Sequence, residues 1–171
     1  MKKGMVVYAF PASGKTTVSE KYDNFIDLES GNFQYDLTPE QLKLSVEERK
    51  GLKRAQNPNW PGNYFEAIKL ARYEYDYVFV AYAGLEYCKK ENIPYMRFFP
   101  TLDQKEDYIA RMRNRGNGEA FVQKIANNFE NYINSSKEDT QAIKIEMQKG
   151  EYLEDCLKRI NIIKTDKESL L

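Results

Sequence analysis

The chain contains no histidine among its 171 residues, which excludes a catalytic triad or a general base built on that side chain. Its two cysteines, Cys88 and Cys156, lie far apart and form no C-x-x-C pair, which argues against a zinc site. Isolated thiols are typical of proteins in a reducing compartment. We therefore expect a cytoplasmic protein.

A net charge is missing as well. Lysine plus arginine total 26, and aspartate plus glutamate also total 26. Because a nucleic-acid binder usually carries a basic excess, we expect no general binding to nucleic acid, although a local basic groove stays open. No apolar run approaches the roughly 18 residues of a membrane-spanning helix, so we expect no membrane partner. The length favours a single domain over residues 1–171.

The most informative segment covers residues 5–17 and reads MVVYAFPASGKTT. An apolar run enters a turn of small residues, and a segment that can form a helix follows. In such a strand–loop–helix unit, successive backbone N–H groups form a nest for anions, and the start of the helix adds partial positive charge. Lys15 would reach the outer phosphates of a nucleotide, and the Thr16 hydroxyl would bind Mg²⁺.

This segment resembles the P-loop, or Walker A motif, G-x-x-x-x-G-K-[ST], of nucleoside triphosphate-binding proteins. Ala9 stands where the first glycine of that motif is expected. It adds only a methyl group, and we expect it to be tolerated if its φ is negative. The alternative interpretation is an ordinary turn and helix cap, against which the preceding apolar strand and the second threonine argue.

Five apolar or alternating runs predict strands, and helical patterns lie between them. The expected strands are residues 5–10, 24–28, 77–82, 95–99 and 142–147. One helix is expected from Thr38 to about Leu52 and another after Thr101, and each begins with the form of a capping box. The alternation favours an α/β fold in three layers, with a parallel sheet covered by helices on both faces.

Ligands bind at the carboxyl ends of the strands in an open parallel sheet, so the residues after each strand deserve most weight. Asp27 and Glu29 follow the second strand, two residues apart. One carboxylate could position Mg²⁺ and the other could orient or deprotonate an acceptor; alternatively, both are solvated turn residues. The third strand ends without an acidic residue, which favours Asp27 as the metal-positioning group.

Two further basic segments could contact phosphates. Arg111 and Arg115 are four residues apart and would share a helix face, from which they could bind a transferring phosphoryl group. The glycines at 116 and 118 would permit a hinge, so we expect a lid over about residues 105–120. An insertion over about residues 34–64 carries Arg49, Arg54 and Trp60, which could hold an acceptor phosphate and stack on a base. The alternative for both segments is a solvated basic face.

The chain resembles small P-loop kinases of the nucleoside monophosphate kinase and shikimate kinase type over nearly its whole length. The phrases FPASGKTT (residues 10–17), DLES (27–30) and RNRGN (113–117) are similar to nucleotide-kinase-like proteins of phages and their bacterial hosts. The resemblance implies a P-loop fold with strand order 2-3-1-4-5 and a helical lid. It also implies that ATP and Mg²⁺ bind at the phosphate loop, and that the loop after the fifth strand lies against adenine.

The motifs and the resemblance together nominate four groups of residues. The expected catalytic residues are Lys15, Asp27, Arg111 and Arg115. The expected ATP-binding residues are Ala12, Ser13, Gly14, Lys15, Thr16, Thr17 and Gly150. The expected acceptor-binding residues are Glu29, Ser30, Arg49, Arg54 and Trp60. The expected metal-positioning residues are Thr16 and Asp27.

We therefore expect a cytoplasmic, ATP-dependent kinase, with a (deoxy)nucleoside monophosphate as the favoured acceptor. One alternative is a hydroxyl acceptor, on a polynucleotide 5′-end or a sugar-like compound, for which Asp27 or Glu29 would have to act as the base. Another alternative is a protein that binds or sequesters a nucleotide without turnover, for instance in phage–host conflict. The sequence leaves open the identity of the acceptor and the oligomeric state.

Overall fold

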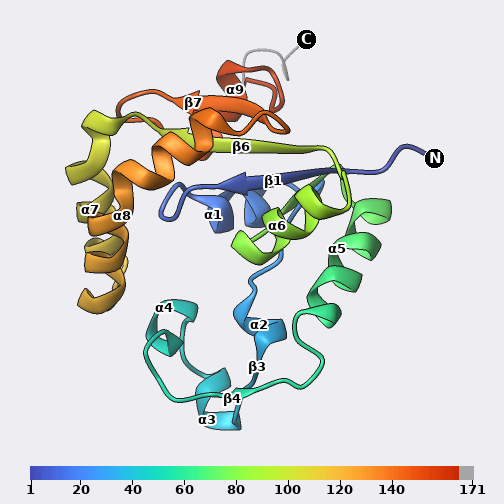
Figure 1. Cartoon of the computed structure of the whole chain (residues 1–171), viewed down its shortest axis with the longest axis vertical. Helices are drawn as coiled ribbons and strands as arrows, with labels where there is room; N and C mark the ends of the chain where they lie inside the picture. The colour runs from blue at the N-terminus through green and yellow to red at the C-terminus, as the bar shows by residue number, and fades with distance from the viewer. Residues whose placement is uncertain (166–171) are drawn as a thin grey trace.

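The structure is a computed structural model that describes residues 1–165. A five-stranded, fully parallel sheet has the order β2-β5-β1-β6-β7. Of these strands, β1, β6 and β7 are labelled in Figure 1. Because β3 and β4 pair with each other in a separate sheet, β5, β6 and β7 are the third, fourth and fifth strands of this one along the chain. The strands are β1 (Met5–Ala9), β2 (Phe25–Asp27), β5 (Tyr77–Phe79), β6 (Tyr95–Pro100) and β7 (Ile143–Met147).

Helices cover both faces of the sheet, and neighbouring residues of β1 serve opposite faces. Val6 packs into the cluster that includes α5 (Gly62–Glu74) and α6 (Tyr82–Lys90). Val7 packs into the cluster that includes α1 (Lys15–Lys21) and α9 (Leu153–Arg159). Burial on both faces explains why β1 reads as an unbroken apolar run. The predicted α/β fold with a parallel sheet covered on both faces is confirmed.

A helical hairpin projects from one end of the sheet. It consists of α7 (Lys105–Asn114) and α8 (Glu119–Glu138), which lie side by side (Figure 1). Phe10, just after β1, packs against Tyr108 of α7 and Phe129 of α8, with ring centroids 5.4 Å apart in each pair. This contact fixes the hairpin beside the loop that follows β1.

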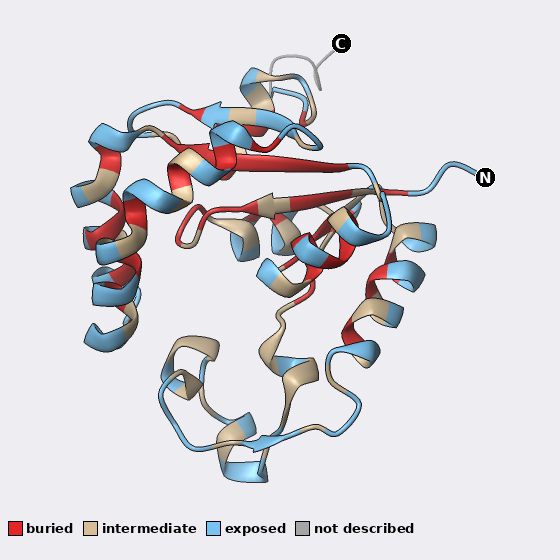
Figure 2. Ribbon diagram, viewed as in Figure 1, coloured by how far each residue is buried: buried red, intermediate tan, exposed pale blue. Residues whose placement is uncertain are grey.

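Between β2 and α5 the chain leaves the sheet and builds an insertion lobe, residues 31–61. Its elements are α2 (Gly31–Gln34), β3 (Tyr35–Asp36), α3 (Pro39–Leu42), α4 (Val46–Arg49) and β4 (Ala55–Gln56). Figure 2 shows that this lobe is mostly exposed or intermediate in burial, whereas β1 and β6 are largely buried. The lobe therefore depends on local hydrogen bonds more than on a core of its own.

The predicted long helix from Thr38 to Leu52 is wrong, because the chain forms two one-turn helices there. The capping box of Thr38 with Gln41 is confirmed at the first of them. Ser45 then caps the second helix: its hydroxyl accepts from the Glu48 N–H at 3.2 Å, and the Glu48 carboxylate accepts from the Ser45 N–H at 2.7 Å. A second capping box starts a new helix and so ends the first. The short pairing of β3 with β4 was not predicted from the sequence.

Two other predicted boundaries are wrong. The third strand of the sheet ends at Phe79 rather than at residue 82, because Ala81 is the extended residue before α6. The capping box predicted at Thr101 does not form, and residues Leu102–Gln104 make a 3₁₀ turn before α7. The Gln104 side chain instead donates to the Met147 carbonyl at 2.8 Å, so it ties α7 to β7.

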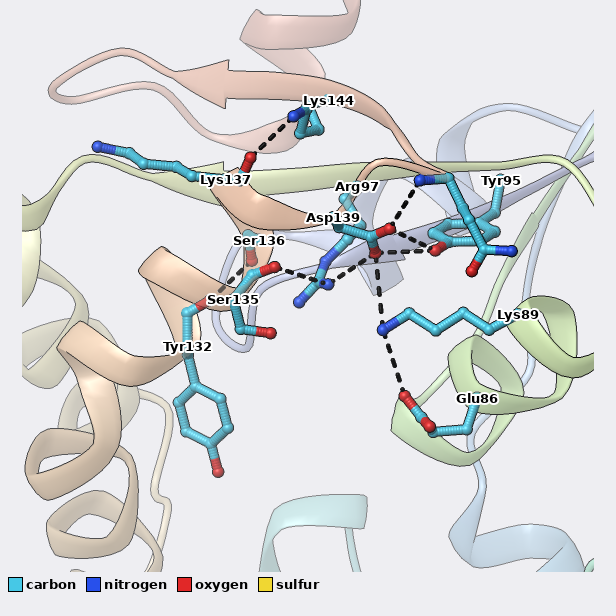
Figure 3. Close-up of polar contacts among 11 residues, drawn as sticks. Glu86, Lys89, Tyr95, Arg97, Tyr132, Ser135, Ser136, Lys137, Asp139 and Lys144 are labelled. Carbon is cyan, nitrogen blue, oxygen red and sulfur yellow. Dashed lines mark hydrogen bonds and ion pairs between the residues drawn. The ribbon is translucent and has the colours of Figure 1, made fainter.

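A buried ion pair lies under the sheet end of α8. Arg97 of β6 donates to Asp139 at 2.9 Å, and both side chains are 3% exposed (Figure 3). The Tyr95 hydroxyl hydrogen-bonds to the same carboxylate at 2.8 Å. Burial raises the pKa of Asp139, but hydrogen bonds from Arg97 and Tyr95 outweigh burial and lower it. The pair therefore stabilises the fold above the usual carboxyl pKa, and that contribution is lost as the pH falls through the lowered value.

Asp139→Ala should lower the free energy of unfolding by about 3–5 kcal/mol, because it leaves a guanidinium buried without its partner. Urea denaturation at neutral pH measures the change. The matched control is Glu119→Ala, which breaks the exposed pair with Arg113 at 2.7 Å and should change stability little. Equal losses of unfolding free energy in the two variants would show that the buried Arg97–Asp139 pair contributes no more to stability than an exposed pair does.

Within residues 1–165, no helix is both long enough and apolar enough to cross a membrane.

Candidate functional site

A cavity of about 870 Å³ opens at the carboxyl ends of β1, β2 and β5. This edge of an open parallel sheet is where ligands usually bind. The sheet, the insertion lobe and the helical hairpin all contribute walls to it. The charged and hydroxyl side chains that line it include Lys15, Thr16, Asp27, Glu29, Lys50 and Arg115.

The loop between β1 and α1 has the backbone of a tight turn. Ala12 and Gly14 are left-handed, with φ of 62° and 101°, and a Cβ atom at Gly14 would come 3.5 Å from the Tyr152 ring. Ala9, buried at the end of β1, is not among the described residues with positive φ, so the condition under which we expected alanine to be tolerated there is met. The Ser13 carbonyl accepts from the Leu153 N–H at 2.8 Å, which fastens the loop to the start of α9.

The start of α1 leaves backbone donors facing the loop. Its first helical hydrogen bond runs from the Val18 N–H to the Gly14 carbonyl at 3.3 Å. The N–H groups of Lys15, Thr16 and Thr17 precede that bond, so they lack partners inside the helix. Thr16 and Thr17 are exposed, and Lys15 lines the cavity.

Thr16 and Asp27 come together at the edge of the cavity. The Thr16 hydroxyl donates to the Asp27 carboxylate at 3.3 Å. Burial raises the pKa of Asp27, and the positive charge of Lys15 opposes that shift. No group of three or more acidic, cysteine or histidine side chains in the described part of the chain could enclose a metal ion. One hydroxyl and one carboxylate fit Mg²⁺, which usually takes one or two carboxylates and completes its shell with water and phosphate oxygens.

Arg115 and Arg111 lie one helical turn apart, with the Arg115 N–H donating to the Arg111 carbonyl at 3.1 Å, but their side chains reach different parts of the molecule. Arg115 lies just beyond the last residue of α7 and lines the cavity. Its guanidinium donates to the Asn117 side chain. Desolvation lowers the pKa of Arg115, and the carboxylates of Glu47 and Glu29 oppose that shift.

Arg111 instead packs against the loop that follows β7. Its guanidinium donates to the Glu151 carbonyl at 3.0 Å and lies 4.0 Å from the centre of the Tyr152 ring. Gly150 is left-handed in the same loop, with φ of 80°. Because Tyr152 also adjoins Gly14, Arg111 and Gly150 lie on the α9 side of the loop between β1 and α1.

The arginines of the insertion lobe lie beside the main cavity. Arg49 donates to the Gln41 and Leu42 carbonyls, each at 2.9 Å, and so braces the lobe. The Arg54 guanidinium lies 3.8 Å from the centre of the Tyr35 ring. Both arginines line a smaller cavity of about 120 Å³, which shares lining residues with the larger one. The shared residues are Glu29, Ser30, Val46 and Lys50.

Trp60 packs away from these cavities. Its ring stacks on Tyr64, with centroids 5.5 Å apart, at the edge of the core under α5. The Tyr64 hydroxyl donates to the Leu28 carbonyl at 2.8 Å and accepts from the Ala81 N–H at 2.9 Å. Trp60 therefore supports the residue that ties together the ends of β2 and β5, and it is not among the described residues that line either cavity.

Lys50 is one of several cavity-lining residues that the sequence motifs did not nominate. It follows α4, lines both cavities, and its ammonium lies 5.0 Å from the centre of the Phe121 ring on α8. Desolvation lowers its pKa, and Glu29 opposes that shift. Its membership of the basic stretch at residues 49–54 was the only signal in the sequence. Across the cavity, Lys50 connects the insertion lobe with the hairpin.

No protein-family model matches this chain, and no curated protein matches it. The residues of the cavity therefore have to carry any conclusion about function.

Proposed function

We propose that this protein is a P-loop kinase that transfers the γ-phosphoryl group of ATP to a (deoxy)nucleoside monophosphate. The observation that carries the proposal is the convergence of Lys15, the Thr16–Asp27 pair and Arg115 on one cavity at the carboxyl edge of a parallel sheet. These are the parts that phosphoryl transfer requires: a cation on the outer phosphates, a metal-positioning pair and an arginine for the transferring group.

The topology supports the kinase resemblance. The strand order 2-3-1-4-5 expected for that family agrees with β2-β5-β1-β6-β7 once the strands of this sheet alone are counted along the chain. The insertion lobe follows the second of these strands, and the hairpin follows the fourth. Both flank the cavity, as an acceptor-binding insertion and a lid would have to.

Each wall of the cavity then has a task. Lys15 and the loop amides bind the β- and γ-phosphates, and Thr16 and Asp27 hold Mg²⁺, which neutralises charge between those phosphates when bound. Arg115 binds the transferring group, and the acceptor phosphate lies toward Lys50, Arg49 and Arg54. An acceptor phosphate oxygen forms the new bond to the γ-phosphorus, the bond from that phosphorus to the β–γ bridging oxygen breaks, and ADP leaves.

The structure changes the role that we propose for Arg111. Because it packs on Tyr152 beside the phosphate loop and the Gly150 turn, we assign it to the nucleoside end of ATP rather than to the transferring group. Gly150 keeps its expected position against adenine in this proposal.

A panel of nucleoside monophosphates, shikimate and a 5′-hydroxyl oligonucleotide, each mixed with Mg·ATP, tests the proposal through ADP release. We expect ADP only when a nucleoside monophosphate is present. ADP release with one of the hydroxyl compounds alone would show that the acceptor is a hydroxyl compound rather than a nucleoside monophosphate. Ligand-induced stabilisation by ATP with no ADP from any mixture would favour the sequestering protein.

Asp27→Asn should lower turnover strongly, shift the Mg²⁺ requirement upward, and yet stabilise the ligand-free fold near neutral pH. The sign follows from the raised pKa of Asp27: its ionised form is disfavoured in the fold, so stability from this group is present at low pH and lost as the pH rises through the raised pKa. Asparagine removes that charge. A Mg²⁺ titration of turnover and urea denaturation with EDTA measure the two effects.

Turnover equal to wild type across the Mg²⁺ titration would give the metal role to another residue, with Glu29 as the next candidate. A stability loss in Asp27→Asn at neutral pH would contradict the direction of the pKa shift.

A further inference from the structure

Part of the cavity wall is aromatic. Tyr8 from β1, Tyr82 from the start of α6, and Tyr132 from α8 line it, and they come from three separate elements. The Tyr8 and Tyr82 rings meet edge to face, with centroids 6.4 Å apart. We call these three residues the tyrosine wall.

One member of the tyrosine wall, Tyr8, is held in place from inside the protein. The Arg97 guanidinium lies over the Tyr8 ring, 5.5 Å from its centre, and Asp139 fixes that guanidinium through the buried pair described above. Figure 3 shows the Tyr132 side chain pointing away from this pair. Tyr8 therefore has a charged, rigid support beneath a ring that borders the cavity.

The polar groups of the tyrosine wall are hydroxyls. Among the residues of the described chain that line the cavity, none is an asparagine, glutamine or histidine. A phenol hydroxyl rotates to donate or to accept, so it can pair with either an amino or an oxo substituent of a base. Burial raises the pKa of Tyr8 to about 12, which keeps its phenol protonated at neutral pH.

We infer that the tyrosine wall binds the base of the acceptor nucleotide without distinguishing between bases, so that the enzyme accepts nucleoside monophosphates of broad base specificity. This inference rests on the proposed function, because it takes the acceptor phosphate to lie toward Lys50, Arg49 and Arg54. Stacking on an aromatic ring tolerates any base, since every base has a π-face. A site that hydrogen-bonds the polar groups on one edge of a particular base behaves differently. Such a site discriminates by about 10⁴-fold against an analogue that lacks those groups.

Calorimetry on the full chain, with dAMP, dGMP, dCMP, dTMP and deoxyribose 5-phosphate as ligands, tests the inference without requiring turnover. The four nucleotides should bind with dissociation constants within about tenfold of one another, and the ring-free phosphate should bind about tenfold or more weaker, because base stacking is lost. Tyr82→Ala and Tyr132→Ala should weaken all four nucleotides alike. Tyr8→Phe keeps the ring but removes the hydroxyl, so it should weaken all four nucleotides by a similar factor, smaller than that of Tyr82→Ala.

Tyr82 is 56% exposed, so its truncation leaves the core intact. Tyr73→Ala on α5 is the control, since Tyr73 is 51% exposed and lies outside the cavity lining within residues 1–165. A preference of about 10³-fold or more for one base, equal binding of deoxyribose 5-phosphate, or no binding of any nucleotide would overturn the inference. Binding of all four nucleotides without ADP release would support the role of the tyrosine wall and contradict the kinase activity. ADP release with one base alone would support the kinase activity and contradict the broad base specificity.

Discussion

Arg115→Ala is expected to lower turnover by about 10³-fold or more, because an arginine on a transferring phosphoryl group acts mainly in the transition state. The dissociation constant of Mg·ATP should change far less. Arg115 is placed for this role at the cavity, next to the carboxylates of Glu29 and Glu47. Single-turnover kinetics and calorimetry measure the two quantities on the same preparation.

Two neighbouring arginines serve as controls for Arg115. Arg113 pairs with Glu119 on the outside of the hairpin, so Arg113→Ala should turn over nearly as wild type does. Arg111 is fixed by the Glu151 carbonyl and Tyr152, so the loss in Arg111→Ala should appear in ATP affinity rather than in the chemical step. If all three variants behave alike, or if the Arg115 loss lies wholly in ATP affinity, these arginines form a solvated basic face.

Lys15→Ala should weaken Mg·ATP binding by at least about tenfold while leaving the fold intact, because hydrogen bonds to charged groups contribute about 1.5–3 kcal/mol. Lys15 lines the cavity and is only partly buried, so its truncation removes no core packing. Calorimetry with Mg·ATP measures the affinity, and thermal unfolding checks the fold.

The matched control for Lys15 is Lys21→Ala at the other end of α1. Lys21 pairs with Glu154 and lies outside the cavity lining given by the described residues, so ATP affinity should not change. Unchanged affinity in Lys15→Ala would end the interpretation of residues 5–17 as a phosphate loop.

The sheet and the tight turn between β1 and α1 were predictable because their signals are local. The apolar run of β1 and the glycine–lysine–threonine turn lie within one short segment. The break between α3 and α4 was also visible as the serine and glutamate of a second capping box, Ser45 and Glu48, which the longer helical pattern concealed. Where two local signals competed, the later cap decided the structure.

The candidate site was predictable only in part, because tertiary contacts decide where long side chains go. The side chains of Arg111 and Arg115 diverge although a helical hydrogen bond joins their backbones, because Arg111 binds the Glu151 carbonyl and Arg115 binds Asn117. Lys50 reaches the cavity only because the insertion lobe folds against α8. Arg97 and Asp139, which support the tyrosine wall, are separated by 42 residues, and no pattern in the sequence connects them.

Transfer of a labelled γ-phosphoryl group tests the central claim most directly. With γ-labelled ATP, Mg²⁺ and a nucleoside monophosphate, the wild-type chain should place the label on the acceptor as a nucleoside diphosphate, and Lys15→Ala should abolish that product. Label found only as inorganic phosphate, or retained on ATP while ATP stays bound, would contradict a kinase built on Lys15, Thr16, Asp27 and Arg115.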